Sequence, residues 1–502
     1  MSKGKGEAVM GGMRWLAIGK LVSMAISFVT TAVLARLLTP YDFGVMAVVL
    51  LVIALSNAIF EGAFGMGVTI KKDIDEGYIA TTFWLSVILS AILVGVLWVI
   101  SPWLEGFFHM PHLAAIIRFT STSLIFNAAS NVSYSLMRRS GQFRTIAIYQ
   151  VGCSLIGYGP VSIGLALMGY GVWALAVGQV AVAVLTSVAA LVLAKMPYHR
   201  FIQRQHIGHV FATSGFLTVS QILNWAALTG SNSVVGRMLG ATQLGLYSRG
   251  WKLLDLVTTV SAQPMSEVLF PAFARMQDDP ERARKALERA LAVAVPFFAT
   301  IAALTIAQSQ FIVWVSLGPK WADTAVIMSI LFLALVPRCC YKVSESVTVA
   351  FQRSGSAALR QGLYAAAMIG FSALAAPHGP VWVAVGASAA VTIFYLSSLG
   401  YAMRLVGLSF LRVIEVHIRA AILAGIIFLI DRVVTAGILP LSFFVANIVG
   451  GAIGLGVAIA LFLYLPGNLL GEALIDLRAQ AIAKTAGIRN KLLRRFGRQG
   501  AD

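Results

Sequence analysis

Ten charged side chains stand within long apolar segments of the chain, and these are the residues best placed to do chemistry. A charge inside a bilayer is costly, so each of them is a candidate for a functional role. The cations outnumber the acids by six to four, which suits an anionic ligand. The cations are Lys20, Arg118, Arg249, Lys252, Arg338 and Lys342, and the acids are Glu61, Asp255, Glu267 and Glu345.

Two triplets of these residues have the spacing of a helix face. The first stands at positions i, i+4 and i+7 and comprises Arg338, Lys342 and Glu345. The second stands at i, i+3 and i+6 and comprises Arg249, Lys252 and Asp255. We predict a cationic cavity for an anionic substrate, formed by Lys20, Arg249, Lys252, Arg338 and Lys342.

The acidic members have two interpretations. Asp255 and Glu345 either couple transport to an ion or pair internally with the lysine three residues before each of them. Glu61, deep in the second apolar segment, either couples transport to a proton or sodium ion or pairs with Lys20 on the neighbouring helix. For Lys20 and Arg338, a water-filled cavity that faces an anion is the favoured interpretation.

No pattern for an enzyme, a metal or a cofactor accompanies these charges. Cys153, Cys339 and Cys340 lie in apolar segments without the spacing of a zinc site. The glycines of residues 450–454 lack the lysine of a phosphate-binding loop and indicate close helix packing instead. We therefore expect a protein that is not an enzyme and that has no cofactor.

The elements that position these charges are expected to be membrane helices. Of the 502 residues, 59% are hydrophobic and 12% are charged, which is about half the charge of a typical soluble domain. About fourteen segments are long and apolar enough to span a bilayer. We place them at residues 13–36, 41–69, 80–104, 113–137, 145–168, 172–194, 213–236, 244–273, 290–317, 323–350, 359–376, 380–403, 417–434 and 440–465.

The basic residues predict the orientation in the membrane. Of the 38 Lys and Arg residues, we place 28 in loops or at helix ends on one side, 4 on the other side and 6 inside helices. Because basic residues gather on the cytoplasmic side, both termini are expected in the cytoplasm of a multi-pass membrane protein. The net charge of +18 thus indicates membrane lipids as partners and not nucleic acid.

The chain nearly repeats itself at a separation of 201 residues. The matched positions are Val33, Arg36, Leu38 and Gly44 in the first copy and Val234, Arg237, Leu239 and Gly245 in the second. The matched Arg and Gly positions indicate hairpin architecture. The copies differ at two pairs of positions, Lys20 against Gln221 and Glu61 against Ala262. These differences mark candidate positions for substrate binding and ion coupling.

We therefore predict an all-α polytopic membrane protein of about 14 transmembrane helices. Two pseudo-symmetric parallel lobes of six helices, related by an axis along the membrane normal, precede two C-terminal helices. The predicted parts are an N-terminal lobe at 1–195, a cytoplasmic linker at 196–212, a C-terminal lobe at 213–403, the last two helices at 404–465 and a basic cytoplasmic tail at 466–502. The tail is expected either to lie on the anionic inner leaflet or to dock a partner.

Several motifs resemble a known family. Residues 34–44 match the pattern L-A-R-x-L-x-P-x-D-F-G, which is typical of the first hairpin of the polysaccharide transporter family, the Wzx-type flippases of the MOP superfamily. Further resemblances follow in order, and the similarity spans about residues 10–360. They lie at residues 136–143, 169–179, 236–248, 270–271 and 317–321.

The resemblance implies a two-lobed alternating-access transporter. Its substrate would be an undecaprenyl-pyrophosphate-linked oligosaccharide, moved to the periplasmic leaflet of the bacterial inner membrane for exopolysaccharide, capsule or O-antigen synthesis. A polysaccharide polymerase and glycosyltransferases would then be partners. Family members have a cation at or near Lys20, whereas Ser231 stands where the family often has an acid, so a coupling role at that position is in doubt.

Two alternative functions stay open. One is a multidrug or lipid II transporter of the same superfamily. The other is a polytopic polysaccharide polymerase or ligase, which would need a large periplasmic loop with catalytic Arg or His residues. The predicted outer loops are a few residues long, which argues against the second alternative.

Overall fold

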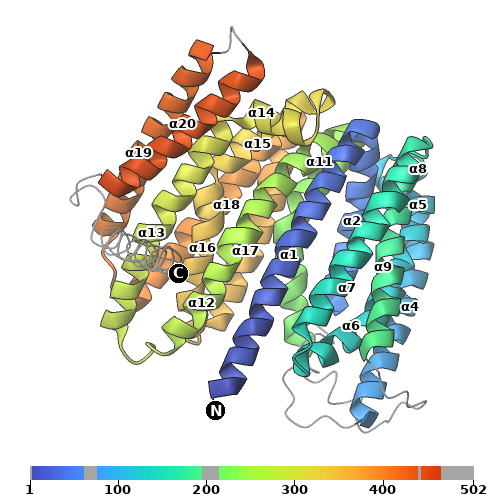
Figure 1. The fold of residues 1–502 in the computed structure, drawn as a ribbon. Coiled ribbons are helices and arrows are strands. Elements are labelled where there is room, and N and C mark those ends of the chain that lie inside the picture. Colours follow the sequence, from blue (N-terminus) through green and yellow to red (C-terminus); the bar gives the residue numbers. More distant parts are fainter. Residues whose placement is uncertain (1–2, 61–75, 195–213, 439–441, 465–502) are drawn as a thin grey trace, which may run out of the picture. The chain divides into compact units, whose positions relative to one another are not determined.

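The computed structural model describes residues 3–60, 76–194, 214–438 and 442–464 (Figure 1). Within these ranges the secondary structure is helical, with no strand. This confirms the predicted all-α fold. Glu61, the linker at 196–212 and the tail at 466–502 lie outside the described residues.

Most of the helices follow the predicted apolar segments closely. In chain order they are α1 (Lys3–Leu37), α2 (Pro40–Phe60), α4 (Glu76–Phe108), α5 (Leu113–Ser121), α6 (Ser123–Arg139), α7 (Phe143–Ile156), α8 (Gly164–Leu167), α9 (Val172–Ala194), α11 (Ser214–Val257), α12 (Gln263–Ala274), α13 (Pro280–Ala307), α14 (Ser309–Ser316), α15 (Ala322–Leu333), α16 (Leu335–Ala350), α17 (Ser354–Ala375), α18 (Pro380–Val406), α19 (Phe410–Ile438) and α20 (Phe443–Tyr464).

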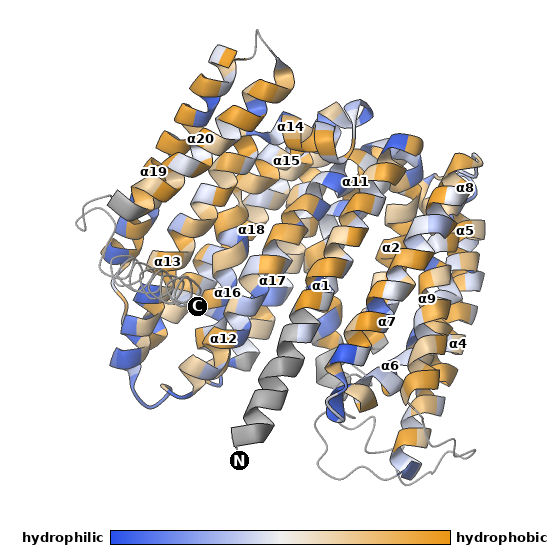
Figure 2. Ribbon diagram, in the orientation of Figure 1, coloured by the Kyte–Doolittle hydropathy of each residue, from blue (hydrophilic) through white to orange (hydrophobic). Residues whose placement is uncertain are grey.

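Eleven helical stretches among the described residues are long and apolar enough to cross a membrane. Hydrophobic residues cover α4, α9 and α20 along most of their length (Figure 2). Helices span bilayers because all their backbone polar groups pair internally. The chain is therefore a multi-pass membrane protein. The layout of fourteen spans in two lobes is compatible with these helices and stays a prediction in its details.

The protein consists of two compact units, and each unit is built from several separate stretches of the sequence. The first unit holds the described residues up to Trp251, with Val313–Ile327 and Gln361–Ala387. The second holds Lys252–Ile312, Met328–Arg360 and the described residues from Ser388 onward. The predicted lobe boundaries follow the sequence repeat and stay a prediction.

Irregular turns interrupt otherwise continuous helices, and one of them is the π-helical turn at Thr258–Ala262 between α11 and α12. Residues Gly157–Ile163 form a π-helical turn between α7 and α8, and this turn contains Pro160, which has no N–H to donate. In α11 the backbone leaves helical geometry at Gly240, whose φ of 82° favours glycine. This break lies between the predicted spans at 213–236 and 244–273.

Within the first unit, Arg36 and Trp321 join the end of α1 to the hairpin between α14 and α15. Arg36 Nη2 donates to the Val315 carbonyl at 3.0 Å, in the last turn of α14. Trp321 Nε1 donates to the Ala35 carbonyl at 2.9 Å. Both bonds satisfy carbonyls at helix C-termini that have no partner in their own helix.

The matched residue Arg237 makes the corresponding contact in the same unit. Its Nη1 donates to His109 Nδ1 at 2.8 Å, and its guanidinium lies 5.0 Å from the centroid of the Phe107 ring. These partners lie at the end of α4. Each arginine of the repeat therefore contacts the hairpin between the third and fourth predicted spans of the opposite copy. This supports the predicted role of the matched arginines in hairpin architecture.

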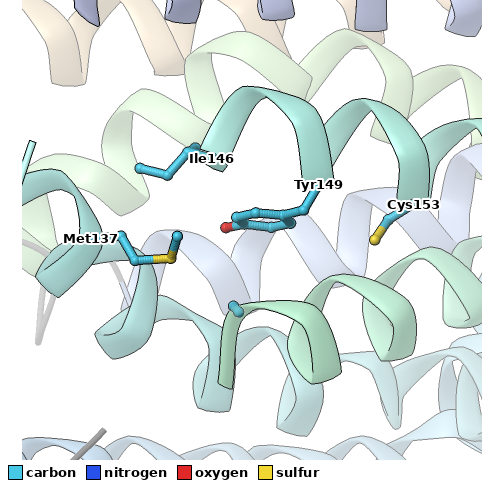
Figure 3. Packing of buried hydrophobic residues seen from close by; sticks show 5 residues of the cluster. Met137, Ile146, Tyr149 and Cys153 are labelled. Atoms are coloured by element: carbon cyan, nitrogen blue, oxygen red, sulfur yellow. The ribbon is translucent and has the colours of Figure 1, made fainter. Parts of the chain in front are cut away.

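A buried cluster joins α6, α7 and α9. Met137, Ile146, Tyr149, Cys153 and Ala190 form it, and Figure 3 shows the Tyr149 ring between Met137 and Cys153. Packing of this kind keeps the side chains of the three helices in single positions.

Helices α13, α19 and α20 pack side by side in the second unit (Figure 1). Gly450 of α20 packs against Thr435, and Gly454 lies against Leu304 and Asp431, where a Cβ atom would collide. The predicted close packing of the glycines at 450–454 is confirmed at these two positions.

Candidate substrate site

The charged residues of α16 lie on one helix face, as their spacing predicts. Arg338 is 2% exposed, and Lys342 and Glu345 are half-buried. Pro337 lies in the first turn of α16. Backbone N–H groups in a first turn have no partner within the helix, so proline breaks no hydrogen bond there. Arg338 and Lys342 are close enough to repel one another. The helix therefore concentrates positive charge at one place.

Acidic residues of neighbouring helices partly balance this charge. Lys342 interacts electrostatically with Asp255 of α11 and Glu267 of α12, and α12 packs directly on α16. Lys252 forms an ion pair with Asp255 at 3.9 Å, and the two side chains are 68% and 42% exposed. An exposed pair of this length holds its partners weakly, so the Lys252 ammonium stays available to a ligand.

Arg360 of α17 joins the same group, although its position predicts a cytoplasmic helix end. It is 7% exposed, and its guanidinium lies 4.4 Å from the centroid of the Tyr401 ring. It interacts electrostatically with Glu345. Among the described residues, its Nε and Nη2 atoms have no hydrogen-bond partner. Guanidinium N–H groups held in this way are ready to bind oxygen acceptors.

The place of Arg360 inside a helix could have been recognised from where that helix begins. A hydropathy window begins the span at 359, whereas α17 begins at Ser354, in a stretch with a second serine at 356. Serine is favoured at helix N-termini, and this start places Arg360 almost two turns inside the helix.

The remaining predicted cations lie in the first unit. Arg249 stacks over the Phe43 ring at 4.7 Å, and its Nε has no hydrogen-bond partner in the described part of the chain. Lys20 is exposed on α1, next to Gly19, which packs tightly against Ala147 of α7. Because Gly19 faces α7, the Lys20 side chain leaves the helix in another direction.

The structure thus brings part of the predicted set together. We use the name charged cluster for its seven linked members in the second unit. They are Lys252, Asp255, Glu267, Arg338, Lys342, Glu345 and Arg360. Four cations face three acids, so the cluster has an excess of one positive charge. Buried guanidinium groups with ammonium groups in the same cluster can bind anions that carry several oxygen acceptors.

The fold is that of a known class of membrane transporters. The structure is similar to that of the lipid II flippase MurJ in an inward closed conformation, with a TM-score of 0.70 and 15% identity, covering 89% of this chain and 98% of MurJ. It is also similar to an inward-facing multidrug resistance MATE transporter of the MOP superfamily, with a TM-score of 0.58 and 14% identity, covering 77% of this chain and 98% of that one. The chain therefore has a MOP-type fold.

The sequence comparison identifies a narrower group of proteins than the fold does. Residues 33–326 match the family described as "Polysaccharide biosynthesis protein", and the chain belongs to this family. The match to the succinoglycan biosynthesis transport protein ExoT of Rhizobium meliloti (strain 1021) is 26% identical over 331 residues. The match to the lipopolysaccharide biosynthesis protein WzxC of Escherichia coli (strain K12) is 25% identical over 334 residues. Each match spans 65% of this chain and 66% of the relative's length.

Proposed function

We propose that this protein is a flippase for lipid-linked oligosaccharides. It would translocate undecaprenyl-pyrophosphate-linked repeat units across the inner membrane by alternating access, for the synthesis of exopolysaccharide, capsule or O-antigen. The family, the names of the two relatives and the MOP-type fold support this proposal. In this proposal the protein changes the leaflet of its substrate and makes or breaks no covalent bond.

The charged cluster is the observation that carries the substrate class. A pyrophosphate linker carries two negative charges and many oxygen acceptors. These match the buried guanidinium groups of Arg338 and Arg360 and the ammonium groups of Lys252 and Lys342. The three acids keep the cluster from binding anions too tightly, since a transporter must also release its substrate. They also offer sites for ion coupling, which is the role we propose for Asp255 and Glu345.

The proposed topology follows from the basic residues. Both termini are placed in the cytoplasm, and the six-plus-six-plus-two division of helices is retained as part of the proposal. Reporter fusions to the tail and to the linker at 196–212 test it. An outward-facing tail would contradict the orientation.

A clean deletion tests the function. We expect loss of surface polysaccharide and accumulation of lipid-linked units on the cytoplasmic side, with recovery by the parent gene. Normal polymer together with altered drug sensitivity would instead identify a multidrug transporter. Purified protein that lengthens lipid-linked units would identify a polymerase.

Single alanine variants of Lys20, Lys252, Arg338 and Lys342 then test the site at matched expression. We expect reduced polymer for each. The matched control is Arg412→Ala, which removes an exposed arginine paired with Glu288 at 2.7 Å. Full recovery by all four alanine variants would overturn the cationic site.

A further inference from the structure

A cavity of uncharged polar side chains lies within the first unit, and it shares no residue with the charged cluster. Its volume is about 280 Å³, near the lower end of the range for small-ligand pockets. Helices α2, α4, α6, α7 and α9 contribute to it. Its described lining consists mainly of amides and hydroxyls, and it includes no Lys, Arg, Asp or Glu.

The amide groups come from three helices. Asn127 and Asn131 stand at positions i and i+4 of α6, so they share one face of that helix. Gln150 comes from α7 and Asn57 from α2. Helical spacing therefore directs several amides toward one space.

These amides have no partner within the described part of the chain. No hydrogen bond joins the side chain of Asn57, Asn127, Asn131 or Gln150 to another described residue. Each amide group has two donors and one acceptor oxygen. All four side chains are half-buried, so their amide groups are open to a polar occupant of the cavity.

Two tyrosines give the cavity a firm wall. Tyr149 is 7% exposed, and its ring is fixed in the cluster with Met137 and Cys153 (Figure 3). Tyr134 packs against the same cluster, and the Arg138 guanidinium lies 5.7 Å from the centroid of its ring. The hydroxyl groups can hydrogen-bond, and the half-buried Tyr134 ring offers apolar surface to a ligand.

We infer that this cavity binds an uncharged sugar residue of the transported glycan, an inference that rests on the proposed function. A sugar hydroxyl is both donor and acceptor, and an amide side chain matches both roles. The described part of the lining has no cation to hold a phosphate and no carboxylate to hold a cationic drug. The protein would then recognise its substrate at two sites of different chemistry, anionic linker at the charged cluster and neutral sugar at the cavity.

Binding measurements on the full chain in nanodiscs test this inference. The probes are bare undecaprenyl pyrophosphate and the same lipid carrying one glucose, galactose or N-acetylglucosamine. We expect the parent to bind at least one glycosylated lipid about tenfold more tightly than the bare lipid, as one or two net hydrogen bonds would give. Asn131→Leu and Gln150→Met should lose this preference and keep the parent's affinity for the bare lipid.

Gln179→Met is the matched control, because Gln179 lies in the same unit and already accepts a hydrogen bond from Tyr158 at 2.6 Å. It should keep the sugar preference and lower the melting temperature, whereas Asn131→Leu and Gln150→Met should leave the melting temperature unchanged or raised. Arg338→Ala should weaken binding of both kinds of lipid. Equal binding of both kinds by the parent, or retained preference in the two cavity variants, would overturn the sugar site alone and indicate a water-filled cavity. A parent that binds neither kind would overturn the proposed function together with it.

Discussion

Gly44 and Gly245 are related by the sequence repeat, and each packs on the backbone of the opposite hairpin. A Cβ atom on Gly44 would collide with the carbonyl of Ala241, and one on Gly245 would collide with the carbonyl of Pro40. Ala241 and Pro40 are themselves 201 residues apart. The contact is therefore reciprocal, as a pseudo-two-fold axis between the two hairpins requires.

Substituting either glycine should destabilise the protein. We expect Gly44→Ala and Gly245→Ala each to lower the free energy of unfolding by about 1–3 kcal/mol, because the extra methyl group overpacks a backbone contact. Thermal unfolding can be followed with a thiol-reactive dye, since Cys153, Cys339 and Cys340 are free and buried. Gly95→Ala, with nothing within 4 Å of the new methyl group, is the control and should be neutral or stabilising. Equal stability of all three variants would contradict the reciprocal contact.

Trp321 should contribute strongly to the packing of the first unit. It is fully buried, its ring meets Phe43 edge-on at 5.3 Å, and it donates to the Ala35 carbonyl. Trp321→Phe loses the hydrogen bond and should cost about 1–2 kcal/mol, whereas Trp321→Ala should cost about 3–5 kcal/mol. Trp382→Phe, at a side chain 56% exposed, should unfold at the parent temperature. The same dye assay measures all three, and a stable Trp321→Ala protein would refute this role.

Periodicity and hydropathy could predict the helices and the shared face of α16, because both depend on local spacing. The 3.6-residue period of a helix was enough to predict that Arg338, Lys342 and Glu345 share one face. The burial of Arg360 could not be predicted in that way, because it depends on where α17 begins and on Tyr401, 41 residues later. Asp431 was overlooked for a similar reason, since its partner Gln308 lies 123 residues earlier.

The cavity of amides gave only a weak signal in the sequence. Asn and Gln side chains leave the charge pattern unchanged, although they lower the hydropathy of the spans at Leu113–Arg139 and Phe143–Leu167. Only the packing of five helices brings them together, and this packing depends on contacts that are distant in the sequence. Charged residues within an apolar segment, in contrast, are easy to recognise in a sequence, because placing a charge in a membrane costs free energy and is therefore rare.

Arg360 and Glu345 should be energetically coupled. Arg360→Ala leaves the Glu345 carboxylate without its principal opposing charge and should lower the free energy of unfolding by about 2 kcal/mol. Adding Glu345→Gln should recover about 1 kcal/mol of that loss, since the uncompensated charge is removed. The double-mutant cycle is measured with the dye assay. Strictly additive losses would show that the two residues do not interact.

Arg360 should also matter for transport. Arg360→Lys keeps the charge but loses the planar group that stacks on Tyr401, so we expect polymer between the levels of the parent and of Arg360→Ala. Polymer is measured in the complemented deletion strain at matched expression. Recovery by Arg360→Ala to the parent level would remove this residue from the substrate site.

Asp431 should act as a structural acceptor between α13 and α19. Its buried Oδ1 accepts from Gln308 Nε2 at 2.6 Å and from Thr435 Oγ1 at 3.4 Å. Asp431→Ala leaves the Gln308 amide without this acceptor and should cost about 1–3 kcal/mol. Asp431→Asn keeps an oxygen at this place, so it should lose less stability and should restore polymer. Asp278→Asn, at an exposed residue between α12 and α13, should behave as the parent. An Asp431→Asn protein that folds as well as the parent but makes no polymer would refute the structural role and identify this carboxylate as an ion-coupling group.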